Sequence, residues 1–178
     1  MERERLRIWD NQRNEEKLCQ FLRQHVYKKR AHGVKHGKIV EAFGMYLAHY
    51  YPECDRDVVR WFAYLHDSQC EVYNPDYNDD GHGQRAADYI DKIRLTYLSE
   101  LNDMQIEKLK TACIMHTSTH KVDDVTVNVC FDSDRMDLPR VNIQVNPEKM
   151  ATDAGANLAQ RKYEECLVLV GCTPTARA

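Results

Sequence analysis

The stretch "WFAYLHDSQC" (61–70) places an imidazole and a carboxylate, His66 and Asp67, side by side at the end of an apolar run. On a helix, Val59, Phe62 and His66 fall on one face, and that face is apolar enough to be turned toward the core. A buried imidazole or carboxylate without a partner costs free energy. The two side chains therefore need partners inside the protein.

Three further apolar stripes carry an imidazole at one end. They are His82 with Ala86, Ile90, Ile93 and Tyr97; His116 and His120 after Ile106, Leu109 and Cys113; and His32 and His36 before Ile39. A single histidine of this kind usually hydrogen-bonds a backbone carbonyl, but the same pattern on four helices is harder to explain in that way. If the ends converge, neutral imidazoles and carboxylates gather, and this donor set suits Zn, Fe, Mn, Ni or Co.

The composition is that of a soluble globular protein of 178 residues, with 43% hydrophobic and 30% charged residues. The formal net charge of -3 argues against sequence-independent nucleic-acid binding, but it is compatible with a small phosphorylated ligand. No apolar run approaches the roughly 20 residues of a membrane span, and the charged start "MERERLRIWD" does not resemble a secretory signal. Seven cysteines without a Cys-x-x-Cys pair favour a reducing compartment, so we expect a cytoplasmic protein.

The scarcity of Gly and Pro, 7 and 5 residues, favours long helices over tight turns. The segment 125–138 is ambiguous, because the alternation of Val125, Val127 and Val129 predicts a strand, whereas Val127, Phe131 and Leu138 also fit a helical face. Elsewhere the patterns and caps predict helices over 3–30, 35–50, 55–67, 82–98, 102–119 and 148–169.

The order of these residues resembles that of the HD superfamily of metal-dependent phosphohydrolases, over roughly residues 30–140. The early His of the family matches His36 in "AHGVKHGKIV", its His-Asp pair matches His66 and Asp67, and its late Asp falls in "CFDSDRMDLPRV". The resemblance implies an all-α bundle of about six or seven helices around a metal site. In such a domain, 31–140 is the metal-binding core, 1–30 a helix packed on it, and 141–178 a C-terminal helix and tail.

Within the late segment, Asp134 matches the family's Asp because it stands immediately before Arg135 and shares a helical face with Phe131. The resemblance therefore favours a helix over 125–138. On this interpretation Asp132 and Asp137 are surface or capping residues.

The remaining histidines resemble the larger version of the family pattern, in which a second metal binds beside the first. His82 and His116 occur in the matching order, and Asp67 would bridge the two ions. His120, one turn after His116, is a candidate further ligand or substrate contact. Glu71 is a candidate base acting on water, and Asp67 could also orient or deprotonate that water.

The resemblance thus implies hydrolysis of a small phosphorylated substrate, such as a nucleotide, by water that one or two divalent transition metal ions activate. The candidate substrate-binding residues, besides His120, are Arg85, Arg135, Arg140 and Lys35. Two alternatives stay open: a di-iron oxygenase with the same ligand set, and a domain that binds a nucleotide without catalysis. Two roles also stay open for the last helix: closing the pocket, or forming a homodimer contact.

Overall fold

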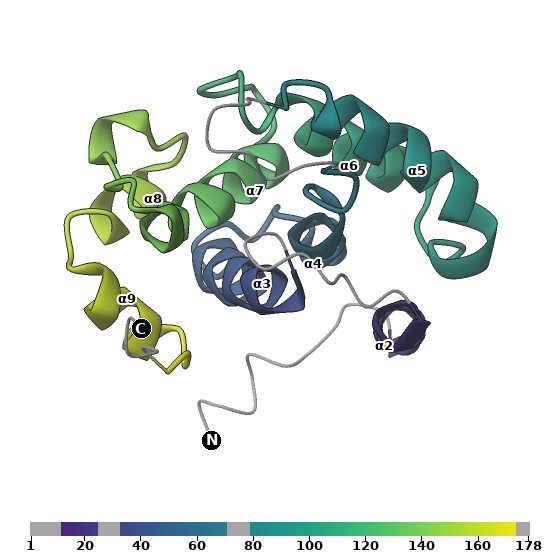
Figure 1. Cartoon of the computed structure of the whole chain (residues 1–178), viewed down its shortest axis with the longest axis horizontal. Coiled ribbons are helices and arrows are strands. Elements are labelled where there is room, and N and C mark those ends of the chain that lie inside the picture. The colour runs from purple at the N-terminus through teal and green to yellow at the C-terminus, as the bar shows by residue number, and fades with distance from the viewer. Residues whose placement is uncertain (1–11, 25–32, 71–78, 174–178) are drawn as a thin grey trace.

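The computed structural model describes residues 12–24, 33–70 and 79–173, and the regular structure of these ranges is entirely helical (Figure 1). The elements are α2 (Gln12–Gln24), α3 (Val34–Ala48), α4 (Arg56–Leu65), α5 (His82–Tyr97), α6 (Asp103–Met115), α7 (Val125–Arg135), η1 (Leu138–Val141), η2 (Pro147–Lys149), α8 (Asp153–Leu158) and α9 (Tyr163–Leu169). The all-α prediction is confirmed, and so is the helical interpretation of 125–138. Of the first predicted helix, the parts 3–11 and 25–30 lie outside the described residues.

Helix α4 is the centre of the bundle. It packs against α3, α6 and α7, and every residue from Asp57 to Leu65 is buried. A helix that is buried all round must lie inside the domain, so the two residues that follow it, His66 and Asp67, emerge in the interior. Figure 1 shows α4 between α3 and α6, with α2 packed at the outside near α5.

Side-chain caps fix where three of these helices begin. The Asp55 carboxylate accepts from the backbone N–H groups of Asp57 and Val58 at the start of α4. Asn102 and Gln105 form a capping box at the start of α6. Asp124 caps α7 in the same way as Asp55 caps α4. Each of these three helices ends with a predicted ligand at or near its C-terminus, so the caps set the register of the ligands.

The single C-terminal helix predicted over 148–169 is wrong. The chain there forms η2, α8 and α9, separated by extended residues such as Thr152 and Lys162. The buried carboxylate of Asp132 explains the first break, because it accepts the N–H groups of Ala151 and Thr152 at 2.7 and 2.8 Å. The N–H groups of Ala151 and Thr152 are therefore hydrogen-bonded to a side chain of α7 rather than to backbone carbonyls of a C-terminal helix.

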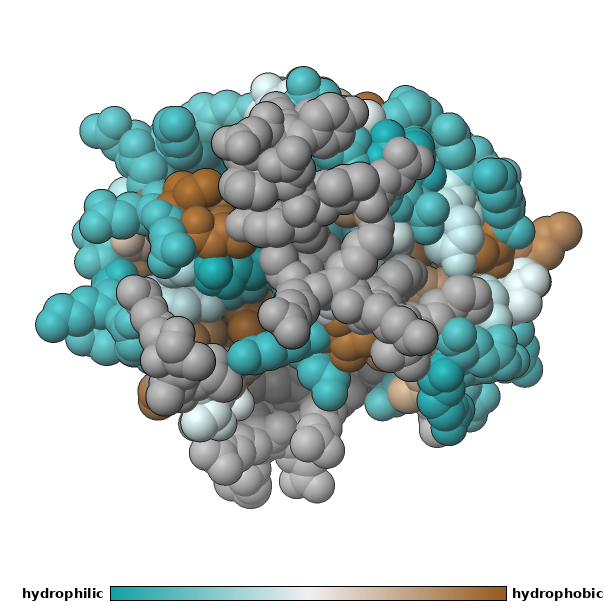
Figure 2. Space-filling model, viewed as in Figure 1, coloured by the Kyte–Doolittle hydropathy of each residue, from teal (hydrophilic) through white to brown (hydrophobic). Residues whose placement is uncertain are grey.

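The described residues show a mostly hydrophilic surface. The face seen in Figure 2 is largely hydrophilic over the coloured residues, with hydrophobic atoms in separate small areas. None of the helices in the described ranges combines the length and the apolar character that crossing a bilayer requires. The seven cysteines all lie in the described ranges, and none of them forms a disulfide.

Candidate metal centre

The structure brings the six predicted metal ligands together. His36 lies on the first turn of α3, His66 and Asp67 follow α4, and His82 begins α5. His116 follows α6, and Asp134 lies near the end of α7. Subsets of these six place their ligand atoms within 4.8 Å of one another. Five of the residues are buried, and the Asp134 side chain is 15% exposed.

Glycines beside two of the histidines let the helices approach closely. A Cβ atom at Gly83 would lie 2.3 Å from the carbonyl oxygen of Cys113, so the backbones of α5 and α6 touch there. A Cβ at Gly37 would lie 2.6 Å from the ring of Tyr64 on α4. The dipeptide His-Gly therefore combines a predicted ligand with a close helix contact at both places, and its repetition is a further signal in the sequence.

The first pair of imidazoles is His36 and His66, whose Nε2 atoms lie 3.1 Å apart. The Nδ1 atom of His36 donates to the carboxylate of Asp137 at 2.6 Å, and the Nδ1 atom of His66 donates to the carbonyl oxygen of Phe62 at 2.9 Å. Because Nδ1 carries the hydrogen in each neutral ring, both Nε2 atoms present lone pairs. In these neutral forms the two lone pairs repel each other, and a shared proton or a metal ion bound by both nitrogens would relieve the repulsion.

The second pair repeats this arrangement. The Nε2 atoms of His82 and His116 lie 3.0 Å apart. Their Nδ1 atoms donate to the carbonyl oxygens of Asp79 and Cys113, respectively. A carbonyl oxygen can only accept, so these Nε2 atoms also face each other with lone pairs.

The carboxylate of Asp67 lies between the two pairs. Its Oδ2 atom is 3.6 Å from His36 Nε2 and 3.4 Å from His66 Nε2. Its Oδ1 atom is 3.4 Å from His82 Nε2 and 3.8 Å from His116 Nε2. Asp134 joins only the first pair, with Oδ1 3.3 Å from His36 Nε2 and 3.4 Å from His66 Nε2.

The electrostatics of the cluster favour positive charge. Burial lowers the pKa of His66, but the carboxylates of Asp67 and Asp134 outweigh it and raise this pKa to about 10. Burial likewise raises the pKa of Asp134, yet the imidazoles of His66 and His36 bring it well below its usual value. At His82, burial dominates and lowers the pKa. A proton or another cation is thus stabilised beside His66, while His82 stays neutral.

These residues fit a divalent transition metal. Zinc and similar ions bind imidazole nitrogen at about 2.0–2.1 Å, which puts neighbouring ligand atoms about 3.0–3.4 Å apart in octahedral or tetrahedral geometry. The separations in the cluster, from 3.0 to 3.8 Å, are close to this spacing. Each Nδ1 atom also has the hydrogen-bond acceptor that metal-ligating histidines usually have.

Of the predicted substrate-binding residues, the structure brings Arg140 to the cluster. Its Nη2 atom lies 3.6 Å from Asp67 Oδ2, and its Nη1 atom lies 4.0 Å from Asp134 Oδ1. Arg135 is placed elsewhere, because its guanidinium donates to the backbone carbonyls of Thr119, His120 and Lys149.

The other candidates lie around the cluster or outside the described residues. Arg85 donates to the carbonyl oxygen of Gln69 and to the carboxylate of Asp79. The imidazole of His120 lies 3.1 Å from the carbonyl oxygen of Met150, and Lys35 is exposed on the first turn of α3. Glu71, the candidate base, lies outside the described residues.

The surface or capping role expected for Asp132 and Asp137 is wrong, because neither side chain is exposed at all. Asp132 binds the backbone of 151–152, and Asp137 accepts the Nδ1 hydrogen of His36. Asp137 follows Asp134 by three residues, so the two project to one side, and this spacing was the signal for its role.

Comparisons with known proteins support the resemblance at the level of the fold. No family model and no curated protein match the chain. The chain is similar to the crystal structure of a predicted HD superfamily hydrolase from an uncultured Thermotogales bacterium. The TM-score is 0.63, the identity is 21%, and the match covers 88% of each chain. An all-α fold of the HD hydrolase type therefore holds this cluster of imidazoles and carboxylates.

Proposed function

We propose that the protein is a metal-dependent phosphohydrolase of the HD superfamily that acts on a small phosphorylated substrate, such as a nucleotide. The observation that carries the proposal is the pair of facing Nε2 atoms, twice repeated, with one oxygen of Asp67 directed at each pair. Such an arrangement leaves a place for a cation within each pair.

The ligands divide into two sets. His36, His66, Asp67 and Asp134 would hold the ion of the first site, and His82, His116 and Asp67 would hold that of the second site. A divalent ion supplies Lewis acidity to a phosphoryl group and lowers the pKa of water from about 15.7 toward about 7. The second site has one protein ligand fewer and so is more open to substrate or water.

Among the residues that the structure describes, Arg140 is the one best placed to bind the phosphoryl group. Its guanidinium lies within 4.0 Å of Asp67 and Asp134, and its side chain is 17% exposed, so it borders both the cluster and solvent. A planar fork of N–H donors matches phosphoryl oxygens and offsets their charge. Lys35, exposed beside His36, would attract an anionic substrate toward the same place.

The test is turnover of an aryl phosphate by protein prepared without chelator and supplied in turn with Mn, Co, Ni, Zn or Fe. Asp67→Asn keeps the shape of the Asp67 side chain but removes its charge, and His66→Ala removes one proposed ligand. Both variants should lose metal and activity together. His49→Ala removes an exposed imidazole away from the cluster and should leave both unchanged.

Two results would redirect the assignment. Iron in the purified protein with an absorbance change on reduction, and no phosphatase activity with any ion, would favour the oxygenase. Unchanged metal content in both His66→Ala and Asp67→Asn would show that the cluster is not a metal centre.

A further inference from the structure

Behind the first site lies a chain of three side chains from distant parts of the sequence. The carboxylate of Asp137 accepts the Nδ1 hydrogen of His36 on one oxygen, and on the other it accepts the hydroxyl of Tyr163. His36 and Asp137 are 101 residues apart, and Asp137 and Tyr163 are 26 apart. Helix α9, at the C-terminal end, is thereby connected to a metal ligand on α3.

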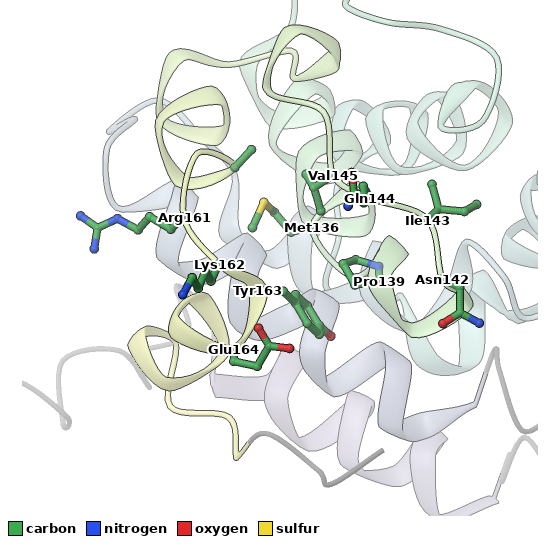
Figure 3. Close-up of a pocket in the computed structure, with 11 residues that line it drawn as sticks. Met136, Pro139, Asn142, Ile143, Gln144, Val145, Arg161, Lys162, Tyr163 and Glu164 are labelled. Atoms are coloured by element: carbon green, nitrogen blue, oxygen red, sulfur yellow. The ribbon is translucent and has the colours of Figure 1, made fainter. Parts of the chain in front are cut away.

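The position of Tyr163 shows how this connection is built. Tyr163 is the first residue of α9, and its ring packs against Phe43 of α3 with 6.4 Å between ring centroids. The ring lines a cavity of about 440 Å³ between the segment 136–145 and the segment 159–164. Figure 3 shows it projecting from the start of α9 toward Pro139. Its hydroxyl end reaches the buried Asp137, while the rest of the residue stays half-buried.

The hydrogen bond to Asp137 determines the tautomer and the orientation of the His36 ring. A carboxylate on Nδ1 fixes the tautomer, holds the ring plane and makes Nε2 a more basic ligand. His36 differs in this respect from His66, His82 and His116, whose Nδ1 atoms donate to backbone carbonyls. Asp137 is also near a positive charge, because Arg140 Nε lies 3.9 Å from its Oδ2 atom.

We propose that Asp137 and Tyr163 are positioning residues for the first site: Asp137 orients His36, and Tyr163 orients Asp137. The inference rests on the proposed function, since it assumes that His36 binds an ion. It makes α9 part of the support of the metal centre, although no residue of α9 is a ligand.

A purely structural role predicts a different result, and the chain offers a matched control for each residue. Asp132 is equally buried and also holds the C-terminal segment, through Ala151 and Thr152, but it does not contact a ligand. Tyr51 holds the same segment by accepting the N–H of Ala154 at 3.1 Å, again away from the ligands. If anchoring alone mattered, Asp132→Asn and Tyr51→Phe would act like changes at Asp137 and Tyr163.

The experiment measures the affinity of the full chain for Mn²⁺ and Zn²⁺ by competition with a chromophoric chelator, together with thermal unfolding of the metal-free protein. We expect Asp137→Asn to weaken binding at the first site by about 10–100-fold, as changes behind a metal-ligating His usually do. Tyr163→Phe should weaken it by a smaller factor. In the double variant Tyr163→Phe should add nothing, because its effect passes through Asp137.

The controls and the second site complete the test. Asp132→Asn and Tyr51→Phe should lower the melting temperature and leave the affinity unchanged. If Asp137→Asn does not fold, Tyr163→Phe still decides, because it removes one hydroxyl and keeps the ring. Wild-type affinity in Tyr163→Phe and Asp137→Asn, or an equal loss in the two controls, would overturn the positioning role alone. A wild-type protein that binds neither ion would overturn the proposed function and this inference together.

Discussion

Binding of a divalent ion to the first site should release a proton from His66. In the metal-free protein the carboxylates of Asp67 and Asp134, each 3.4 Å from Nε2 of His66, raise its pKa from 6.5 to about 10 in spite of burial. Between pH 6.5 and about 10 the ring therefore keeps a proton on the same Nε2 atom that an ion needs. The ion has to displace this proton.

The size of the effect follows from the pKa of His66 in the metal-free protein. At pH 8, about two units below the pKa of His66, about 99% of the rings are protonated, so this residue contributes about one proton per ion. The apparent affinity should rise about tenfold per pH unit from pH 7 to pH 9, or about 1.4 kcal/mol per unit. His82 adds no proton in this range because its pKa is lowered, and neither does Asp134, whose carboxyl is already ionised.

Titration calorimetry in two buffers of different ionisation enthalpy measures the proton number directly. His82→Gln is the matched control, because it removes an imidazole of the second site and leaves the proton of His66 in place. A proton number near zero, with an affinity that does not change between pH 7 and pH 9, would refute the electrostatic account of the cluster. The same proton stabilises the metal-free fold, an effect that is complete below pH 6.5 and lost as the pH rises through about 10.

Three further changes test the packing and the substrate site. Gly83→Ala forces a methyl group against the carbonyl oxygen of Cys113, 2.3 Å away, and should lower the free energy of unfolding by about 1–3 kcal/mol in urea denaturation. Asp132→Asn replaces one of two buried carboxylate oxygens, which together accept three hydrogen bonds, by an NH2 group that cannot accept, and should cost about 1–3 kcal/mol in the same assay. Arg140→Lys loses the planar fork beside the cluster and should raise KM for an aryl phosphate about 10-fold or more. Arg135→Lys should leave KM unchanged, because the guanidinium of Arg135 donates to backbone carbonyls rather than lying at the cluster.

Exposed neighbours serve as references for the two stability changes. Gln84→Ala lies on the solvent side of α5, and Asp123→Asn lies just before α7, so each should change stability by less than about 0.5 kcal/mol. Equal losses in Gly83→Ala and Gln84→Ala would contradict the close contact of α5 with α6. A KM that rises as much in Arg135→Lys as in Arg140→Lys would contradict the placement of the phosphoryl group beside Arg140.

The histidines of the cluster could be predicted to lie together because the pattern that identifies them is local. An imidazole at the end of an apolar stripe is visible in a few turns of helix, and His66, His82 and His116 each occupy such a position. The scarcity of Gly and Pro indicated helices in the same local way. What these patterns could not give is the identity of the partners behind the ligands.

Two predictions from the sequence are wrong for the same physical reason: the surface or capping role of Asp132 and Asp137, and the single helix over 148–169. Asp132 and Asp137 look like surface residues in a segment rich in charge, and their burial depends on groups far along the chain. Asp132 needs the backbone of 151–152, and Asp137 needs His36 and Tyr163. The apolar spacing over 148–169 is compatible with one continuous helix, but the hydrogen bonds from Asp132 to the backbone of 151–152 interrupt it.

The four histidines differ in how much of the fold they need in order to be oriented. His66, His82 and His116 each donate Nδ1 to a carbonyl oxygen three or four residues earlier, so a helix end alone sets their rings. His36 obtains its acceptor from Asp137, which depends in turn on Tyr163. The orientation of His36 therefore depends on contacts with η1 and α9, whereas the rings of His82 and His116 are held by backbone groups at the ends of α5 and α6. We therefore expect metal affinity at the first site to depend on the hydrogen bond between Tyr163 and Asp137, and affinity at the second site to be independent of it.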